Sequence, residues 1–269
     1  MTIKIKQGDF TGLAEDYSNC RPDYSKVVLQ SLLRHTGANN VADVGAGTGI
    51  WSRMLSQVGL KTFAVEPCED MREEGIRFTA DFDIDWHGGS AEATGLNDAS
   101  VDWVTMASSF HWADTPASLG EFHRILKPGG HLTVLWNPRN IDGNEMHEEI
   151  EQLVHDLVPT LKRVSSGRAK NSRDWTDDLQ STGHFTDCIF MEARHKIAMS
   201  HERYVGAWRS GLRLIRSPNS GPRRRPSTAM TWAARTPKSA TKRPKRSPTG
   251  LPRIPWSGSC QPRPPPSMT

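Results

Sequence analysis

The stretch "VADVGAGTGI", residues 41–50, decides the fold. It is an apolar run that carries one acid, Asp43, and ends in glycines at alternate positions, Gly45, Gly47 and Gly49. Glycines permit a tight turn and a close approach of the backbone to a ligand, and the helix that follows offers N–H groups at its start. The stretch therefore predicts a buried strand that ends in a ligand-binding loop.

Strand and helix patterns alternate on both sides of this loop. A helix is predicted over 21–37, with Pro22 at its entrance and Gly37 as its stop. Strands are expected at 39–45, 61–67, 82–88, 101–108, 131–137 and 185–199, and helices at 48–59, 68–78, 115–126, 144–159, 173–183 and 201–210. Short alternating elements predict an α/β fold: a doubly wound, mostly parallel, Rossmann-like sheet with helices on both faces.

The composition divides the chain into two parts. Residues 211–269 hold 12 of the 18 prolines, 13 of the 34 Lys and Arg residues and none of the 30 acids, so this part carries a formal charge of +13 and residues 1–210 carry −9. We therefore expect one globular domain over 1–210 and a basic Pro/Arg/Ser-rich tail over 211–269. The tail shows neither helical nor strand periodicity, which predicts disorder.

The remaining composition argues against several classes of protein. The four cysteines are scattered without the ligand spacing of a zinc site, which fits a reducing compartment and predicts no metal. The first residues lack the apolar core of a secretory signal, and no apolar run approaches the roughly 20 residues that span a bilayer. These features predict a soluble, cytoplasmic protein without a membrane partner.

Two acids bear on the ligand of the glycine loop. The spacing is G-x-G-x-G, whereas dinucleotide-binding loops read G-x-G-x-x-G. Asp43 precedes the first glycine by two residues; it would repel a pyrophosphate and attract an ammonium group. Glu66, at the end of the second strand, can accept hydrogen bonds from ribose hydroxyls. S-adenosylmethionine (SAM) meets both demands, and an NAD(P)-dependent oxidoreductase stays as the alternative because dinucleotide enzymes place an acid like Glu66 similarly.

The blocks "VADVGAGTG", "VEPCEDM", "GGSAEATGL", "VDWVTMASSFHWAD" and "RILKPGGHLTVLWN" stand in the order and spacing of a known family. The chain resembles the class I SAM-dependent methyltransferases over about residues 10–210. It is most similar to methyltransferase type 11 proteins, the group with trans-aconitate and quinone-precursor methyltransferases. The resemblance implies SAM as cofactor, a small-molecule methyl acceptor and a cofactor site formed by Asp43, Gly45, Ala46, Gly47, Glu66, Ser90, Ala91, Glu92 and Ala107.

On the acceptor side, the resemblance implies that the loop "ASSFHWAD" faces the transferred methyl group. His111 is the candidate base; alternatively it orients the loop or stacks with Trp112. Phe110 and Trp112 are expected to wall the acceptor pocket, with core packing as the alternative. Tyr17 and Arg21 are expected to cap it, and Arg21 to pair with an acceptor carboxylate unless it lies on the surface.

The family fold ends in an antiparallel strand that this sequence lacks. The tail is interpreted as the product of a shifted reading frame, because acids vanish where Arg, Pro and Ser rise together. Two alternatives stay open: a disordered tail without function, or a basic tail that binds nucleic acid without specificity in an inactive truncated chain. If the frame is shifted, the fifth strand loses a neighbour and the sixth has no pairing partner.

Overall fold

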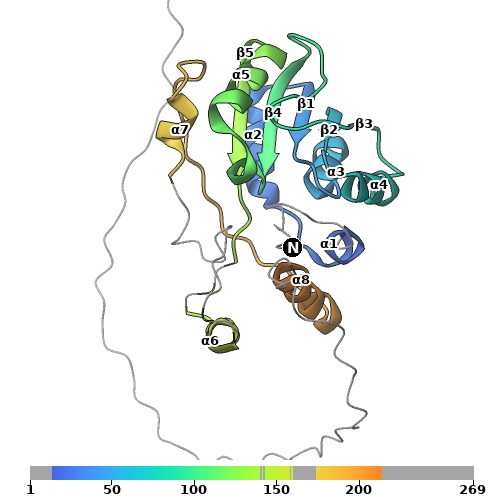
Figure 1. Cartoon of the computed structure of the whole chain (residues 1–269), viewed down its shortest axis with the longest axis vertical. Helices are drawn as coiled ribbons and strands as arrows, with labels where there is room; N and C mark the ends of the chain where they lie inside the picture. Colours follow the sequence, from blue (N-terminus) through green and yellow to red (C-terminus); the bar gives the residue numbers. More distant parts are fainter. Residues whose placement is uncertain (1–13, 140, 142, 158, 160–173, 214–269) are drawn as a thin grey trace, which may run out of the picture. The chain divides into compact units, whose positions relative to one another are not determined.

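The computed structural model describes residues 14–139, 141, 143–157, 159 and 174–213. Its centre is a five-stranded sheet in the order β3-β2-β1-β4-β5, and all four neighbouring pairs are parallel (Figure 1). The strands are β1 (Asn40–Val44), β2 (Lys61–Val65), β3 (Ile84–His87), β4 (Val101–Ala107) and β5 (Leu126–Leu135). The predicted doubly wound parallel sheet is confirmed.

The helices follow the predicted alternation. They are α1 (Ala14–Cys20), α2 (Lys26–Thr36), α3 (Ile50–Gln57), α4 (Glu69–Phe78), α5 (Thr115–Ile125), α6 (Glu145–Leu157), α7 (Thr176–Gln180) and α8 (His201–Arg213), with a 3₁₀ turn at Phe110–Trp112. Local signals set several ends: Ser25 Oγ accepts a hydrogen bond from the N–H of Val28 at the start of α2, and Gly37 ends that helix with a φ of 57°. None of the described helices is long and apolar enough to cross a membrane.

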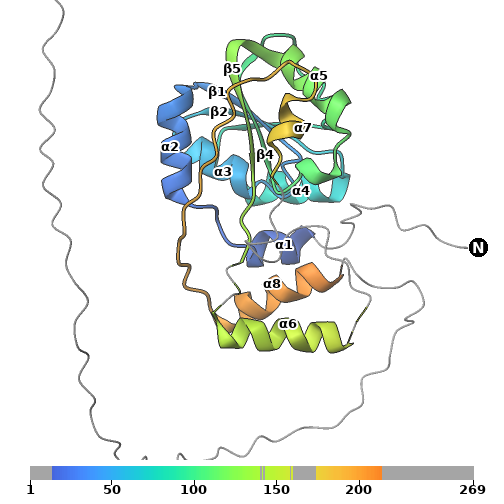
Figure 2. The ribbon, with the colours of Figure 1, turned by 90° about the vertical axis from the view of Figure 1, so that its left-hand side faces the viewer.

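The two faces of the sheet carry separate apolar clusters, because alternate residues of a strand point to opposite faces. One cluster joins Val41 and Trp103 to Leu29 of α2 and to Trp51, Met54 and Leu55 of α3. The other joins Ala42, Val44, Val104 and Met106 to Leu119, Phe122 and Ile125 of α5. Figure 2 shows α2 and α3 on one side of the sheet and α5 and α7 on the other. Both faces of the sheet are therefore covered by helices, as the sequence pattern predicts.

β5 begins earlier than predicted and contains an irregularity. Val101 pairs with Leu126 and Trp103 with His131, so four residues, 127–130, stand opposite Asp102 alone. Lys127 Nζ reaches Asp102 Oδ1 at 2.7 Å, and Asp102 Oδ2 accepts the N–H groups of Asn39 and Asn40. The "KPGG" turn therefore forms a bulge that is tied to the start of β1.

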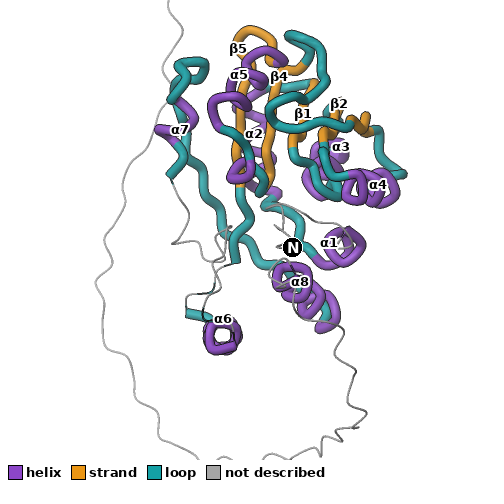
Figure 3. Tube along the Cα trace, viewed as in Figure 1, coloured by secondary structure: helices purple, strands orange, loops and turns teal. Residues whose placement is uncertain are grey.

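The predicted sixth strand over 185–199 is wrong. This segment has no regular secondary structure, and Figure 3 draws the path from α7 to α8 as loop. A strand needs a neighbour for its backbone hydrogen bonds, and in the part of the chain that the structure describes, β5 pairs only with β4. Because this segment does not pair with a strand, its apolar side chains are not packed against the sheet: Ile189 and Phe190 are 65% and 87% exposed. The predictions for the tail fall largely outside the described residues, which end at Arg213.

Candidate functional site

The glycine loop between β1 and α3 has the conformation that only glycine adopts without strain. Gly45, Gly47 and Gly49 have φ values of 68°, 58° and 79°. A Cβ on Gly45 would lie 2.7 Å from Oγ of Ser109, whereas a Cβ on Gly47 would meet only Met71 Cε, at 3.5 Å. Sterics therefore require glycine at 45, and backbone conformation requires it at 47.

The backbone donors at the start of this loop are already engaged. The N–H groups of Gly45 and Ala46 both donate to the carbonyl of Val65, at 2.8 and 3.1 Å. The N–H of Gly47 donates to Glu66 Oε2 at 2.8 Å, and Glu66 Oε1 accepts from the N–H of Cys68 at 2.9 Å. The loop is held to the end of β2 by hydrogen bonds that a phosphate-binding loop would direct to its ligand.

Asp43 lies beneath the loop and is fully buried. Its Oδ2 accepts from Ser52 Oγ at 2.6 Å and its Oδ1 from Thr105 Oγ1 at 3.3 Å. The contact with Thr105 follows from register, since Asp43 of β1 pairs with Thr105 of β4. Sequence reasoning missed Ser52 and Thr105, although strand alternation places Asp43 on the face that α3 covers.

Two buried carboxylates thus share the space under the loop. Burial raises the pKa of Asp43 from 3.8 to about 7, against the lowering effect of the Ser52 and Thr105 hydrogen bonds, and the charge of Glu66 raises it further. Burial also raises the pKa of Glu66, against the hydrogen bonds from Cys68 and Gly47 and the charge of Arg72. A cationic group bound nearby would lower both pKa values, and a phosphate would raise them.

Ser90, Ala91 and Glu92, which the resemblance assigns to the cofactor site, lie in the loop between β3 and β4. Ser90 and Ala93 exchange backbone hydrogen bonds at 3.0 and 3.3 Å, Ala91 is buried, and Glu92 is exposed. Glu92 Oε1 accepts the N–H of Asp114, the residue that caps α5, at 2.8 Å. The carboxylate of Glu92 therefore connects this loop to the loop that follows β4.

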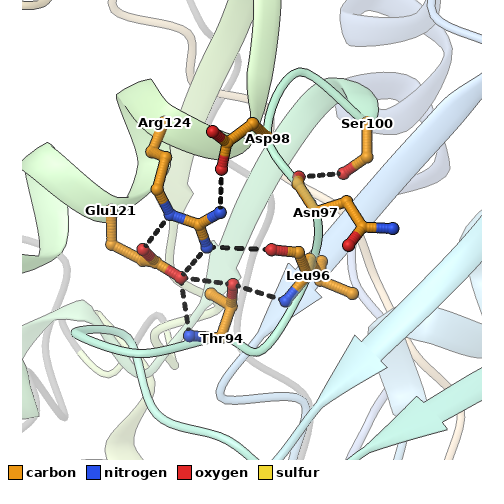
Figure 4. A network of polar contacts seen from close by, with 7 residues as sticks. All are labelled: Thr94, Leu96, Asn97, Asp98, Ser100, Glu121 and Arg124. Atoms are coloured by element: carbon orange, nitrogen blue, oxygen red, sulfur yellow. Dashed lines mark hydrogen bonds and ion pairs between the residues drawn. The ribbon is translucent and has the colours of Figure 1, made fainter.

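A polar network holds the rest of the β3–β4 loop against α5 (Figure 4). Glu121 Oε1 accepts from the N–H and the hydroxyl of Thr94, at 2.8 and 2.6 Å. Arg124 donates to both oxygens of Glu121, to Asp98 and to the carbonyl of Leu96. The hydrogen bonds from Arg124 are the largest cause that lowers the pKa of Glu121 to about 2. The i,i+3 spacing of Glu121 and Arg124 on α5 is a local signal for their ion pair, whereas no local pattern indicates their contacts with Thr94, Leu96 and Asp98.

Strand β4 ends at Ala107, a half-buried residue that pairs with Leu135 of β5. Ser108 follows with a φ of 59°, unusual for a residue other than glycine. Tyr24, from the segment before α2, donates its hydroxyl to Ser108 Oγ at 2.9 Å. Ser109 Oγ donates to the carbonyl of Val44 at 3.1 Å. These two serines join the loop to β1 and to the N-terminal segment.

The three aromatic residues of this loop have different environments. Phe110 is fully buried, 5.2 Å from the ring of Trp175, which supports the core-packing alternative. Trp112 is 37% exposed, and the centre of its ring lies 4.7 Å from that of His111, with the two ring planes tilted by 44° rather than stacked. Burial lowers the pKa of His111, and its Nδ1 has no hydrogen-bond partner among the described residues. A neutral imidazole of this kind is able to accept a proton.

The two predicted capping residues lie in the N-terminal segment. Tyr17 belongs to α1, but its side chain lies outside the described part of the chain. Arg21 lines a cavity of about 310 Å³ with Arg53 and Arg203. Sequence reasoning did not single out the last two arginines, which come from α3 and α8. Within the described residues no three His, Cys, Asp or Glu side chains form a metal-binding group.

Comparison with known proteins points to one family. Residues 42–134 match the methyltransferase domain family. An uncharacterized methyltransferase of Mycobacterium tuberculosis (strain ATCC 25618 / H37Rv) is 34% identical over 149 residues, which cover 55% of this chain and 60% of the relative. A demethylmenaquinone methyltransferase of Renibacterium salmoninarum is 37% identical over 144 residues, 51% of this chain and 60% of the relative. The chain thus spans about 60% of the length of these relatives.

An uncharacterized methyltransferase-like protein of Schizosaccharomyces pombe is 28% identical over 223 residues, which cover 74% of this chain and 80% of that protein. Among solved structures, a geranyl diphosphate C-methyltransferase from Streptomyces coelicolor is similar with a TM-score of 0.38 and 18% identity, over 47% of this chain and 50% of that one.

Proposed function

The chain carries a class I methyltransferase domain of Rossmann-like fold, and we propose that it transfers the methyl group of SAM to a small-molecule acceptor. Two relatives support a small organic acceptor: one is named a ubiquinone/menaquinone biosynthesis C-methyltransferase and the other a demethylmenaquinone methyltransferase. The basic tail has no part in this proposal.

The observation that carries the choice of cofactor is the charge under the glycine loop. Asp43 and Glu66 bring two buried carboxylates there, and the N–H groups of Gly45, Ala46 and Gly47 already donate to β2 and to Glu66. A dinucleotide pyrophosphate would find no free donors at these three residues and would face two acids. An ammonium and a sulfonium group would instead reduce the cost of keeping both carboxylates ionised.

The residues present fit SAM without a change of fold. Because Gly47 has no side chain, a ligand can approach the loop backbone closely there; a Cβ at this position would touch Met71 Cε at 3.5 Å. Glu66 keeps unused lone pairs for ribose hydroxyls, because each of its oxygens accepts one N–H. Asp43 is out of reach of a direct contact while it stays fully buried. We therefore assign it the role of an electrostatic anchor that also holds Ser52 and Thr105 in place.

SAM supplies an activated methyl group, so the chain's own residues mainly align the acceptor and exclude water. The loop after β4 is the element we assign to this task, since Ser108 and Ser109 fix it to the N-terminal segment and to β1. His111 is neutral near pH 7 and would take a proton from an acceptor hydroxyl or an acidic carbon. Trp112 offers an exposed apolar wall beside it.

Calorimetry of the full chain with S-adenosylhomocysteine and, separately, with NAD⁺ tests the proposal. We expect saturable binding of the first and none of the second. Asp43→Asn and Glu66→Gln should each weaken binding at least tenfold, whereas Asp81→Asn, a change at an exposed aspartate, serves as the control. Binding of NAD⁺ alone would favour the oxidoreductase, and binding of neither ligand by a cooperatively folded preparation would refute both assignments.

A further inference from the structure

Glu66, which directly follows β2, is held by hydrogen bonds at all four of its polar groups. Each carboxylate oxygen accepts one backbone N–H, and the N–H of Glu66 donates to the carbonyl of His87 in β3 at 3.1 Å. The carbonyl of Glu66 accepts from Nη1 of Arg72 at 3.0 Å. Three of these four partners are therefore backbone groups, and the fourth, Arg72, is a side chain.

Helix α4 places Arg72 at this position. The N–H of Arg72 donates to the carbonyl of Cys68 at 2.9 Å, in the first turn of the helix. Side chains of a helix point toward its N-terminus, so the guanidinium extends back to the end of β2. A residue that stands six positions after Glu66 in the sequence thus contacts its backbone.

The guanidinium of Arg72 also lies against Gly88, which directly follows β3. A Cβ on Gly88 would lie 3.3 Å from Nη1, 3.5 Å from Cζ and 3.8 Å from Nη2 of Arg72, so the planar group presents its face to this glycine. Gly88 does not have a positive φ. The space that a glycine leaves here, rather than its backbone conformation, is therefore what accommodates Arg72.

Arg72 brings a positive charge to a region with two buried acids, Asp43 and Glu66. The side chain of Arg72 is half-buried, and it forms no ion pair within the part of the chain that the structure describes. Its charge acts on Glu66 through space, where it opposes the effect of burial on the pKa of that carboxyl group. Glu66 is therefore easier to ionise with Arg72 present than without it.

We propose that Arg72 is a positioning residue of the cofactor site, which fixes Glu66 between β2 and β3 and supplies the positive charge that its carboxylate needs to accept ribose hydroxyls. The inference rests on the proposed function and adds a second residue to the ribose end of that site. Arg72 acts through Glu66 and has no contact with the reacting atoms in this assignment. The sequence analysis did not single it out.

Isothermal titration of the full chain with S-adenosylhomocysteine, and with the analogue of it that lacks both ribose hydroxyls, tests this inference. We expect Arg72→Gln to raise the Kd of S-adenosylhomocysteine about tenfold, the equivalent of about one pKa unit at Glu66. The Kd of the analogue should change less than about threefold, because the analogue has no hydroxyls for Glu66 to bind. In a Glu66→Gln background, Arg72→Gln should likewise add less than about threefold.

Three variants accompany this comparison. Arg72→Lys keeps the charge and should raise the Kd of S-adenosylhomocysteine by less than about threefold. Arg72→Met removes the charge but keeps the apolar stem, so it repeats the test if Arg72→Gln does not fold. Arg77→Gln is the matched control, since Arg77 lies on the same helix, forms an ion pair with Glu74 and has a side chain that is 74% exposed. It should leave the Kd unchanged.

The outcomes separate the two proposals. If S-adenosylhomocysteine binds but Arg72→Gln does not weaken it, the role of Arg72 is refuted and the proposed function stands. An equal loss for both ligands, as a purely structural role would give, also refutes it, as does a loss in Arg72→Lys as large as in Arg72→Gln. If the wild type folds cooperatively in urea denaturation and binds neither ligand, the proposed function fails and this inference fails with it.

Discussion

Replacing Asp43 by Asn should stabilise the protein at neutral pH while it weakens the cofactor site. The carboxylate is fully buried, and its pKa rises from 3.8 to about 7. Because the folded state holds the proton more tightly than the unfolded state, this group's contribution to stability is fully present below about pH 4. It is lost progressively as the pH rises to about 7. At about 1.4 kcal/mol for each pH unit, the ionised Asp43 costs about 4 kcal/mol above pH 7.

Asn has nearly the same shape and no charge, and the hydroxyls of Ser52 and Thr105 can each rotate to donate or accept. Part of the gain is offset, because the Asn amide N–H₂ needs acceptors that the carboxylate did not need. We therefore expect a net stabilisation of about 1–4 kcal/mol at about pH 8 and little difference at about pH 4. The affinity for S-adenosylhomocysteine should fall at least tenfold at the higher pH, because the buried charge is gone.

The assay is urea denaturation of both proteins at several pH values from about 4 to about 8, together with calorimetry at the upper end of this range. Asp81→Asn is the matched control for the loss of one exposed carboxylate. In the wild type, affinity for S-adenosylhomocysteine, through its ammonium group, should rise with pH up to about 7, as Asp43 ionises. A free energy difference between Asp43→Asn and the wild type that does not change with pH would refute the argument, as would undiminished binding by the variant.

Further changes test other parts of the structure. Gly47→Ala should lower the free energy of unfolding by about 1 kcal/mol, because Gly47 has a φ of 58°. Gly45→Ala should lower it further, because its Cβ would lie 2.7 Å from Ser109, and thermal unfolding of the two variants measures the difference. Arg124→Ala should lower the free energy of unfolding by about 1–2 kcal/mol, because it removes the hydrogen bonds from Arg124 to Glu121, Asp98 and the carbonyl of Leu96; urea denaturation measures the loss. Because the pKa of Glu121 is lowered to about 2, the difference in unfolding free energy between the wild type and this variant should be largest above about pH 5. It should shrink as the pH falls toward about 2. Phe190→Ser should change stability by less than about 0.5 kcal/mol, since Phe190 is 87% exposed, and a large loss would show that 185–199 is packed.

The sequence by itself determined the sheet and the position of its glycine loop. The apolar runs at 41–44 and 101–106 and the glycines between β1 and α3 are local signals, and the strands and helices formed where these signals lie. The predicted strand at 185–199 failed for a reason that is not local. Its β propensity is real, but a strand needs a neighbouring edge, and the described chain supplies none beyond β5.

The details of the site were decided only by the tertiary structure. The sequence singled out Asp43 as a partner for an ammonium group, but the pairing of β1 with β4 and the packing of α3 bury its carboxylate against Ser52 and Thr105. Arg53 and Arg203 lie 150 residues apart in the sequence and line the same cavity, and no local pattern in the sequence indicates that they meet. Local patterns specify which segments form strands and helices. Which charged side chains share one buried space depends on how those elements pack, and that contact information is spread along the whole chain.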